Sequence, residues 1–177
     1  MQLESERILL FPLTYENLIT YLQGENKLER ELNLSEGERT ISPELIEAFH
    51  ETILIAVADP GNNYLYSTLW NIVDKASNQM VGDLCFKGEP NANGEIEIGY
   101  GIYPPFAGKG YMTDAIRLLI EWAFDQPEVN AIIAETESAN IASHKTLLKN
   151  NFWQYKEGLE TQKIVKKVEI RKPWENI

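Results

Sequence analysis

Hydrophobic and polar residues follow one another along this chain with a spacing that changes several times, and each change marks a predicted element. Residues 7–14 form a short apolar run stopped by Pro12, which is typical of a first strand. Apolar residues at helical spacing follow over 15–22, directly after Thr14, a good N-cap residue. Residues 23–41 are polar and lack a clear period, so we expect a loop there with at most a short helical turn.

The next segment begins as a helix and then changes to the period of strands. Ser42 precedes a proline and a glutamate, which is a good helix start, and the apolar stripe predicts a helix over 43–57. Two β-rich runs follow, over 64–74 and 79–88, joined by a loop of hairpin length. A second turn leads into a third run from Glu95, so we expect an antiparallel meander of three strands.

The strongest helical period in the chain lies at 110–124. Its apolar residues recur every three or four positions: Met112, Ala115, Ile116, Leu119 and Trp122. An apolar strand is predicted next, over 131–136, and a crossover helix makes it parallel to the strand that begins at Glu95. A second helix over 141–150 and two strands over 152–158 and 163–172 close the chain.

Composition narrows the class of protein without identifying it. The chain has 177 residues, of which 44% are hydrophobic and 24% charged, so we expect one domain over 1–177 with a sizeable core. No apolar run approaches the roughly 20 residues that span a bilayer. Two glutamates and no basic leader precede the first apolar run, which is unlike a secretory signal. The expected location is the cytoplasm, with no membrane partner.

Charge and sulfur content exclude several kinds of site. The net charge of −11 disfavours binding of nucleic acid through its phosphates. It suits either a cationic substrate or simple solubility. Cys85 is the one cysteine, so an internal disulfide is ruled out, and its apolar neighbours predict a core residue rather than a nucleophile. His50 and His144 have no metal-ligand spacing, so we expect no metal.

A glycine-bearing turn between a strand and a helix is the first candidate for chemistry. Main-chain N–H groups at such a turn and the helix dipole both favour an anionic ligand. Two phosphate motifs do not fit. Lys109 is followed by Gly110 where a P-loop requires Ser or Thr, and the spaced glycines that begin at Gly99 end at Pro104 instead of a third glycine.

The run resembles instead the acetyl-CoA-binding motif of the GNAT acetyltransferases, [RQ]-x-x-G-x-[GA]. Residues 97–102 read E-I-G-Y-G-I and residues 107–115 read A-G-K-G-Y-M-T-D-A. Both are similar to the branch that contains the ribosomal-protein N-terminal acetyltransferases. Further along, Glu135-Thr136 and the segment from Asn140 to Ser143 resemble the E-T-x-x-x-N-x-x-S of that branch.

This resemblance implies an α/β (α+β) fold. We expect a mixed, mostly antiparallel central sheet of about six to seven strands flanked by helices, with a splayed parallel strand pair forming the cofactor cleft. It also implies an acetyl-CoA-dependent N-acetyltransferase that acetylates a primary amine. A protein N-terminus, a polyamine and an aminoglycoside all remain open as acceptors, as do a monomer and a homodimer.

Three positions depart from the family pattern. Ala107 replaces the usual Arg or Gln, which should weaken CoA binding without abolishing it. Met112 replaces a Gly or Ala and would crowd the pyrophosphate unless its side chain points into the core. Asn151 replaces a glycine, a mild change because asparagine tolerates the left-handed conformation at a helix end. These departures keep a second reading open, a non-catalytic acyl-CoA-binding or regulatory module with a degenerate site.

The resemblance also implies the residues that bind the cofactor. The N–H groups of 107–112 would hold the pyrophosphate, and the main chain near Ile102 and Tyr103 would pair with the pantetheine arm. Asn140 would bind pantetheine, although a plain helix N-cap explains it equally. The full predicted set is Ile102, Tyr103, Ala107, Gly108, Lys109, Gly110, Tyr111, Met112, Asn140 and Ser143.

Acetyl transfer needs a group that takes a proton from the ammonium and one that gives a proton to the leaving thiolate. Glu97 is the candidate base, directly or through water, unless it is only a solvent-facing strand residue. Glu95 is its rival. Ser143 is the candidate on the thiol side, with Tyr100 and Tyr155 as alternative proton donors unless they serve packing.

Overall fold

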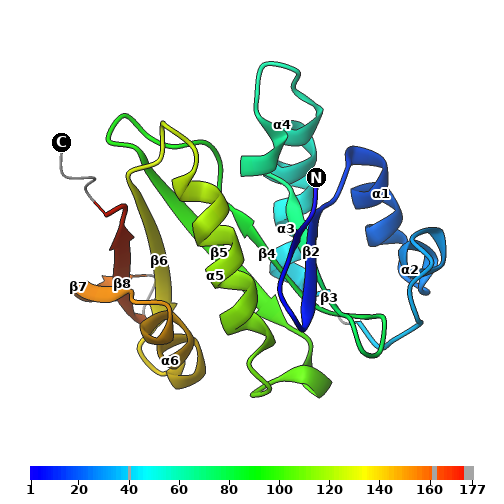
Figure 1. Ribbon diagram of the computed structural model, residues 1–177. Helices are drawn as coiled ribbons and strands as arrows, with labels where there is room; N and C mark the ends of the chain where they lie inside the picture. The colour runs from blue at the N-terminus through cyan, green and yellow to red at the C-terminus, as the bar shows by residue number, and fades with distance from the viewer. Residues whose placement is uncertain (40, 161–162, 174–177) are drawn as a thin grey trace.

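An eight-stranded mixed sheet runs through the centre of the computed structural model (Figure 1), which describes residues 1–39, 41–160 and 163–173. Some side chains lie outside the description, namely those of 155–157, 159–160 and 163–167. The strand order is β1-β2-β3-β4-β5-β6-β8-β7. The strands are β1 Leu3–Glu4, β2 Ile8–Pro12, β3 Leu69–Asp74, β4 Gln79–Phe86, β5 Glu95–Ile102, β6 Ala131–Glu137, β7 Trp153–Glu160 and β8 Lys163–Arg171. Neighbours are antiparallel except β5 and β6, which are parallel, as the crossover helix predicts.

Helices cover both faces of this sheet. On one face lie α5 Tyr111–Phe124 and α6 Ile141–Lys149 (Figure 1). The other face is covered by α1 Tyr15–Gln23, α2 Lys27–Glu31, α3 Pro43–Ala48, the π-helical turn η1 Phe49–Ile53 and α4 Leu54–Ala58. Two short 3-10 turns complete the set, η2 Tyr64–Tyr66 and η3 Pro104–Phe106. No helix in the described part of the chain combines the length and apolarity needed to cross a bilayer.

Each face of the sheet has its own apolar core. The core under α5 contains all five residues of the predicted stripe, among them Ala115, Ile116 and Leu119, which are fully buried. Trp122 lies at its centre, with ring centroids 5.1 Å from Trp70 and 5.4 Å from Tyr66. Burial of this one broad face therefore fixes α5 across the sheet and sets the position of its N-terminus.

Most predicted elements are confirmed, including their caps. Thr14 forms a capping box at α1, and the Ser42 side chain accepts from the third residue of α3. One prediction was wrong. The run 64–74 forms a strand only from Leu69, because Asn63 caps a 3-10 turn over Tyr64–Tyr66. The helix over 43–57 is present but contains the unpredicted π-helical turn η1.

Candidate functional site

The turn before α5 has the conformation that an anion site needs. Gly108 and Gly110 have φ values of +74° and +86°, a region that other residues rarely adopt. Gly110 is the N-cap of α5, and no side chain caps the helix there. The first N–H groups of a helix have no partner within it, so those of α5 are available to a ligand together with the positive end of the helix dipole.

The side chain of Arg7, the residue that directly precedes β2, contacts this turn and the start of α5. Its guanidinium donates to the main-chain oxygen of Lys109 at 3.0 Å and forms an ion pair with Asp114 at 3.5 Å. It also lies over the ring of Tyr111, 4.7 Å from the ring centroid. These contacts join Lys109 of the turn, and Tyr111 and Asp114 of the first turn of α5, to the residue that precedes β2.

The parallel strands β5 and β6 separate before β5 reaches the turn, and a gap opens between them. The two strands pair only through 95–97 with 131–133 and then separate. Beyond that point β5 still pairs with β4, whereas β6 pairs with β8. The parallel pair therefore splays, as the resemblance implied, and one edge of β5 is left without a strand partner.

The pairing with β4 determines which main-chain groups of β5 face this gap. The main-chain oxygen of Glu97 accepts from the N–H of Lys87, the residue after β4, at 2.9 Å, and the N–H of Tyr103 donates to the oxygen of Val81 at 2.9 Å. Successive residues of a strand direct their main-chain groups to opposite sides. The groups of Tyr100 and Ile102 consequently point away from β4, toward the gap, where an extended ligand can pair with them.

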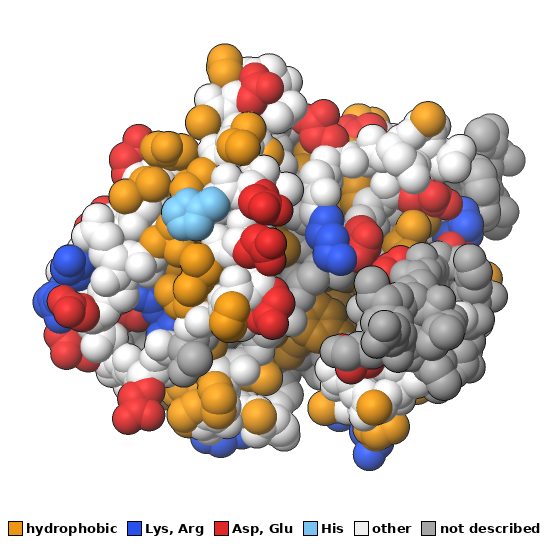
Figure 2. Space-filling view, turned by 180° about the vertical axis from the view of Figure 1, so that it is seen from behind, with side chains coloured by type: hydrophobic (Ala, Val, Ile, Leu, Met, Phe, Trp, Pro, Cys, Tyr) orange, Lys and Arg blue, Asp and Glu red, His pale blue; other side chains and the backbone are white. Residues whose placement is uncertain are grey.

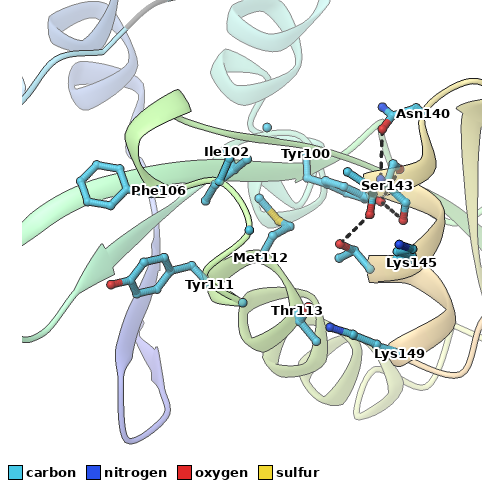
Figure 3. A pocket seen from close by; sticks show the side chains of 16 residues that line it. Tyr100, Ile102, Phe106, Tyr111, Met112, Thr113, Asn140, Ser143, Lys145 and Lys149 are labelled. Atoms are coloured by element: carbon cyan, nitrogen blue, oxygen red, sulfur yellow. Dashed lines mark hydrogen bonds between the residues drawn. The ribbon is translucent and has the colours of Figure 1, made fainter.

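A cavity of about 490 Å³ connects the turn, the edge of β5 and α6 (Figure 3). Eight of the ten predicted cofactor residues line it: Ile102, Ala107, Gly108, Gly110, Tyr111, Met112, Asn140 and Ser143. Two predicted residues lie apart. The hydroxyl of Tyr103 is buried against Asp83, and the Lys109 ammonium lies 5.3 Å from the ring centroid of Phe106.

Sequence reasoning missed two cations of this cavity. Lys145 and Lys149, one turn apart on α6, both line it, together with Thr113 and Thr146 (Figure 3). Within the described part of the chain, neither lysine forms an ion pair. In a chain of net charge −11, two such lysines beside a helix N-terminus favour an anionic ligand. Their i, i+4 spacing after Asn140 was the available signal.

The departures from the family pattern have simple structural outcomes. The Met112 side chain is 7% exposed and belongs to the core under α5, so it forms one wall of the cavity and does not extend over the turn. Asn151 has φ +63°, the left-handed conformation predicted for it at the end of α6.

The predicted thiol-side residue has a close hydroxyl partner. The Ser143 hydroxyl and the Tyr100 hydroxyl lie 2.7 Å apart, so the two groups form one hydrogen-bonded pair in the cavity (Figure 3). Burial raises the pKa of Tyr100 above its usual value, with the Ser143 hydrogen bond opposing the change. Tyr100 therefore stays protonated at neutral pH and can act as a proton donor. Asn140 caps α6 by accepting from the Ser143 N–H at 3.0 Å.

The predicted base lies on the opposite face of the sheet. Side chains alternate along β5, so Tyr100 points toward α5 and Glu97 points to the other side. There Glu97 forms an ion pair with Lys87, the residue that follows β4. Its rival Glu95 accepts from Asn91 at 3.1 Å, near the end of the strand that is paired with β6. The side chain of Tyr155 lies outside the described residues.

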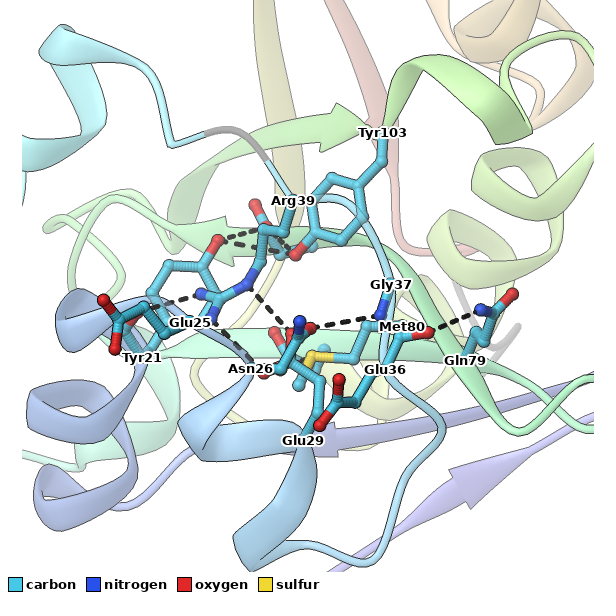
Figure 4. A network of polar contacts seen from close by, with 12 residues as sticks. Tyr21, Glu25, Asn26, Glu29, Glu36, Gly37, Arg39, Gln79, Met80 and Tyr103 are labelled. Atoms are coloured by element: carbon cyan, nitrogen blue, oxygen red, sulfur yellow. Dashed lines mark hydrogen bonds and ion pairs between the residues drawn. The ribbon is translucent and has the colours of Figure 1, made fainter.

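Further along that face, a buried carboxylate joins α1 to the sheet. Asp83 accepts hydrogen bonds from the hydroxyls of Tyr21 at 3.0 Å and Tyr103 at 3.2 Å. Arg39 lies over the Tyr21 ring, 3.9 Å from the ring centroid, and pairs with Glu29 at 3.1 Å (Figure 4). Burial raises the pKa of Asp83 to about 6, although the two tyrosine hydrogen bonds oppose it.

We expect the Asp83→Asn variant to isolate the contribution of Asp83 to the pH dependence of the free energy of unfolding. The folded state binds the Asp83 proton more tightly than the unfolded chain, so the stabilisation is complete below about pH 4 and is lost as pH rises through about 6. The free energy of unfolding of the natural protein, relative to the variant, should fall by about 3 kcal/mol between these limits. Urea titrations of both proteins between about pH 4 and about pH 7 measure this difference in unfolding free energy. A difference that does not change with pH would contradict the prediction.

Comparisons with known proteins agree with this geometry. The uncharacterized N-acetyltransferase YjdG of Bacillus subtilis (strain 168) is 41% identical over 83 residues, which cover 47% of this chain and 49% of that protein. The chain thus spans about half the length of the curated relatives it matches. A solved structure of RimL, a ribosomal L7/L12 α-N-protein acetyltransferase in complex with coenzyme A, matches with TM-score 0.67 at 17% identity, covering 97% of this chain and 98% of that one.

A spermidine N-acetyltransferase from Vibrio cholerae matches with TM-score 0.64 at 15% identity, covering 92% of this chain and 94% of that one. At such identities the likeness concerns the fold. The assignment of family rests on the model of the acetyltransferase (GNAT) domain, which matches residues 7–152 and so covers the turn, the splayed strands and α6. The chain belongs to the GNAT acetyltransferase domain family.

Proposed function

We propose that this protein transfers the acetyl group of acetyl-CoA to a primary amine. The observation that carries the proposal is the cavity between α5 and α6. It joins a helix N-terminus and two lysines at one end to an unpaired strand edge and a hydroxyl pair at the other. Acetyl-CoA has the matching chemistry, because its phosphates precede a pantetheine arm with two amides and a terminal thioester.

Each part of the cofactor has a group of this chain to receive it. The N–H groups of 107–112 bind the pyrophosphate, with charge from Lys145 and Lys149. The main-chain groups of Tyr100 and Ile102 pair with the pantetheine amides in the gap beside β6. The thioester then lies near Ser143. The RimL structure, solved with coenzyme A, has the same fold and supports this assignment.

The reaction uses the hydroxyl pair of this cavity together with Glu97, whose side chain lies on the other face of β5. The amine nitrogen attacks the thioester carbonyl carbon, the new C–N bond forms, and the C–S bond breaks to give the amide and CoA thiolate. Glu97 accepts the first proton of the ammonium and passes it to solvent. The Tyr100 hydroxyl donates a proton to the thiolate through Ser143, and the second proton of the attacking nitrogen restores it.

A non-catalytic acyl-CoA-binding module is not favoured. A degenerate site would be expected to have lost its cavity or its polar groups. Here the Met112 side chain packs into the core, and both the Tyr100–Ser143 pair and Glu97 are retained. Ala107 still offers its main-chain N–H to the ligand.

Calorimetric titration with acetyl-CoA, followed by a thiol-release screen of amines and short peptides, tests the proposal. Lack of binding at millimolar concentration would exclude the enzyme. We expect the double variant Lys145→Gln, Lys149→Gln to raise the Kd about tenfold at low salt, since two phosphate contacts are lost. The difference should shrink as salt is added.

A control for the change of charge is Lys27→Gln, which removes one positive charge at the exposed first residue of α2, away from the cavity. It should leave the Kd unchanged. Equal effects of the control and the double variant would mean that the lysines act only through overall charge.

A further inference from the structure

A second cavity lies on the face of the sheet opposite α5. It measures about 330 Å³ and lies between the helical segment α3–η1–α4 and the end of β4. The helical side of the lining includes Leu45, Ala48, Ile53 and Ala56, and the other side includes Cys85 of β4 and Lys87, which follows the strand. The π-helical turn η1 contributes to its wall, and π-turns within helices are frequent at functional sites.

This cavity adjoins the part of β5 that carries Glu97. Cys85 pairs with Gly99, and a Cβ on Gly99 would lie 3.8 Å from both the Cys85 sulfur and the Lys87 side chain. Gly101 on the same face has open space, with no atom of the described residues within 4 Å of an added Cβ. The two glycines thus leave a shallow path along β5 from the cavity toward the gap beside β6.

Lys87 links the cavity to the proposed base. Its side chain lines the cavity, and its ammonium pairs with the Glu97 carboxylate. The Lys87 side chain is 55% exposed, so solvent can replace this contact at little cost. A primary ammonium already lies at the position where Glu97 would accept a proton from a substrate ammonium.

We propose that this cavity binds the apolar group of the acceptor, a primary amine whose ammonium displaces that of Lys87 from Glu97. The inference rests on the proposed acetyl transfer and adds the class of acceptor. Among the described residues that line the cavity there is no Asp or Glu, so a second cationic group of a polyamine has no partner there.

The surface near this region has the matching character. Figure 2 looks onto this face and shows hydrophobic side chains next to a row of acidic ones, beside a hollow in the surface. An acceptor that joins one ammonium to one aliphatic or aromatic group meets both kinds of side chain. A free arylalkylamine and a peptide with an apolar first residue share this chemistry.

The test fills the cavity without touching the cofactor site. Ala56→Leu adds an aliphatic side chain at the cavity wall within a helix that tolerates leucine. Ala58→Leu is the matched control, because it makes the same change on α4 at an exposed position outside the lining. Phenethylamine, ethylamine, spermidine and tripeptides beginning with Leu or Ser serve as acceptors.

We expect the natural protein to prefer phenethylamine or the Leu peptide over the other acceptors, and Ala56→Leu to lower kcat/KM for the preferred acceptor at least about tenfold. Turnover of ethylamine and the KM for acetyl-CoA should change less than about twofold, and Ala58→Leu should change nothing. If the protein prefers the Leu peptide but not phenethylamine, the acceptor is a protein N-terminus. The inference would be overturned if Ala56→Leu lowered kcat/KM equally for the preferred acceptor and for ethylamine, or did not lower it at all. A preference of the natural protein for spermidine would also overturn it.

Failure of the acetyl transfer itself is a separate result. If acetyl-CoA binds but no amine is acetylated, the proposed function fails, and the cavity is then tested by calorimetry with phenethylamine and the Leu peptide in the presence of CoA. Binding to the natural protein that Ala56→Leu abolishes would support the apolar site. Absence of binding by the natural protein would overturn it.

Discussion

Glu97→Gln is expected to lower kcat about 10²- to 10⁴-fold, the usual contribution of a positioned general base. Glutamine has almost the same shape as glutamate but cannot accept the proton of the ammonium. Glu97 lies on β5 where the strand begins to separate from β6, and its carboxylate faces the side from which we propose the amine arrives. Steady-state thiol release at saturating acetyl-CoA measures the effect.

Glu95→Gln is the matched control, on the same strand and the same face. Its carboxylate accepts from Asn91 and lies within the closed part of the β5–β6 pair, away from the gap. We expect its kcat to stay within about twofold of the natural value. If Glu95→Gln lowered kcat strongly and Glu97→Gln did not, Glu95 and not Glu97 would be the general base.

Gly108→Val should raise the Kd of acetyl-CoA about 100-fold, or about 2.7 kcal/mol. A β-branched residue strongly resists φ +74°, so the turn must shift, and its N–H groups then no longer point at the phosphates. An added Cβ would meet no described atom within 4 Å, so we attribute the expected loss to strain in the main chain and not to a clash with neighbouring side chains. Calorimetric titration measures the affinity directly.

Gly24→Val separates strain from binding in that experiment. Gly24 follows α1 with φ +67° and also has open space around an added Cβ, but it lies outside the cavity. Both variants should lose similar thermal stability, and only Gly108→Val should lose affinity. A similar loss of affinity in both would show that the turn acts through overall stability alone.

The fold was largely predictable because its elements carry strong local signals. The stripe from Met112 to Trp122 matches the buried face of α5, and Thr14 and Ser42 cap the helices they precede. The errors arose where tertiary contacts prevail over local pattern. Residues 64–66 have strand-like composition, yet the Tyr66 ring packs in the Trp122 cluster as part of a 3-10 turn.

The candidate site was predictable where a motif is contiguous. The turn from Ala107 to Met112 is such a motif, and the structure places it on the cavity. Lys145 and Lys149 belong to no motif, and only the packing of α6 beside α5 brings them to the cavity. Similarly, the direction of the Tyr103 main chain depends on the register with β4, which the sequence of β5 alone does not contain.

The contact of Arg7 with the turn before α5 joins two parts of the chain that are 102 residues apart. One end of this contact directly precedes β2, which with the two-residue β1 forms an edge of the sheet. A ligand that binds only the ordered turn must, by linkage, also favour the state in which Arg7 contacts the turn and this edge is packed against it. Cofactor supply would thereby protect the N-terminal hairpin from pairing with other chains, a hazard common to exposed sheet edges.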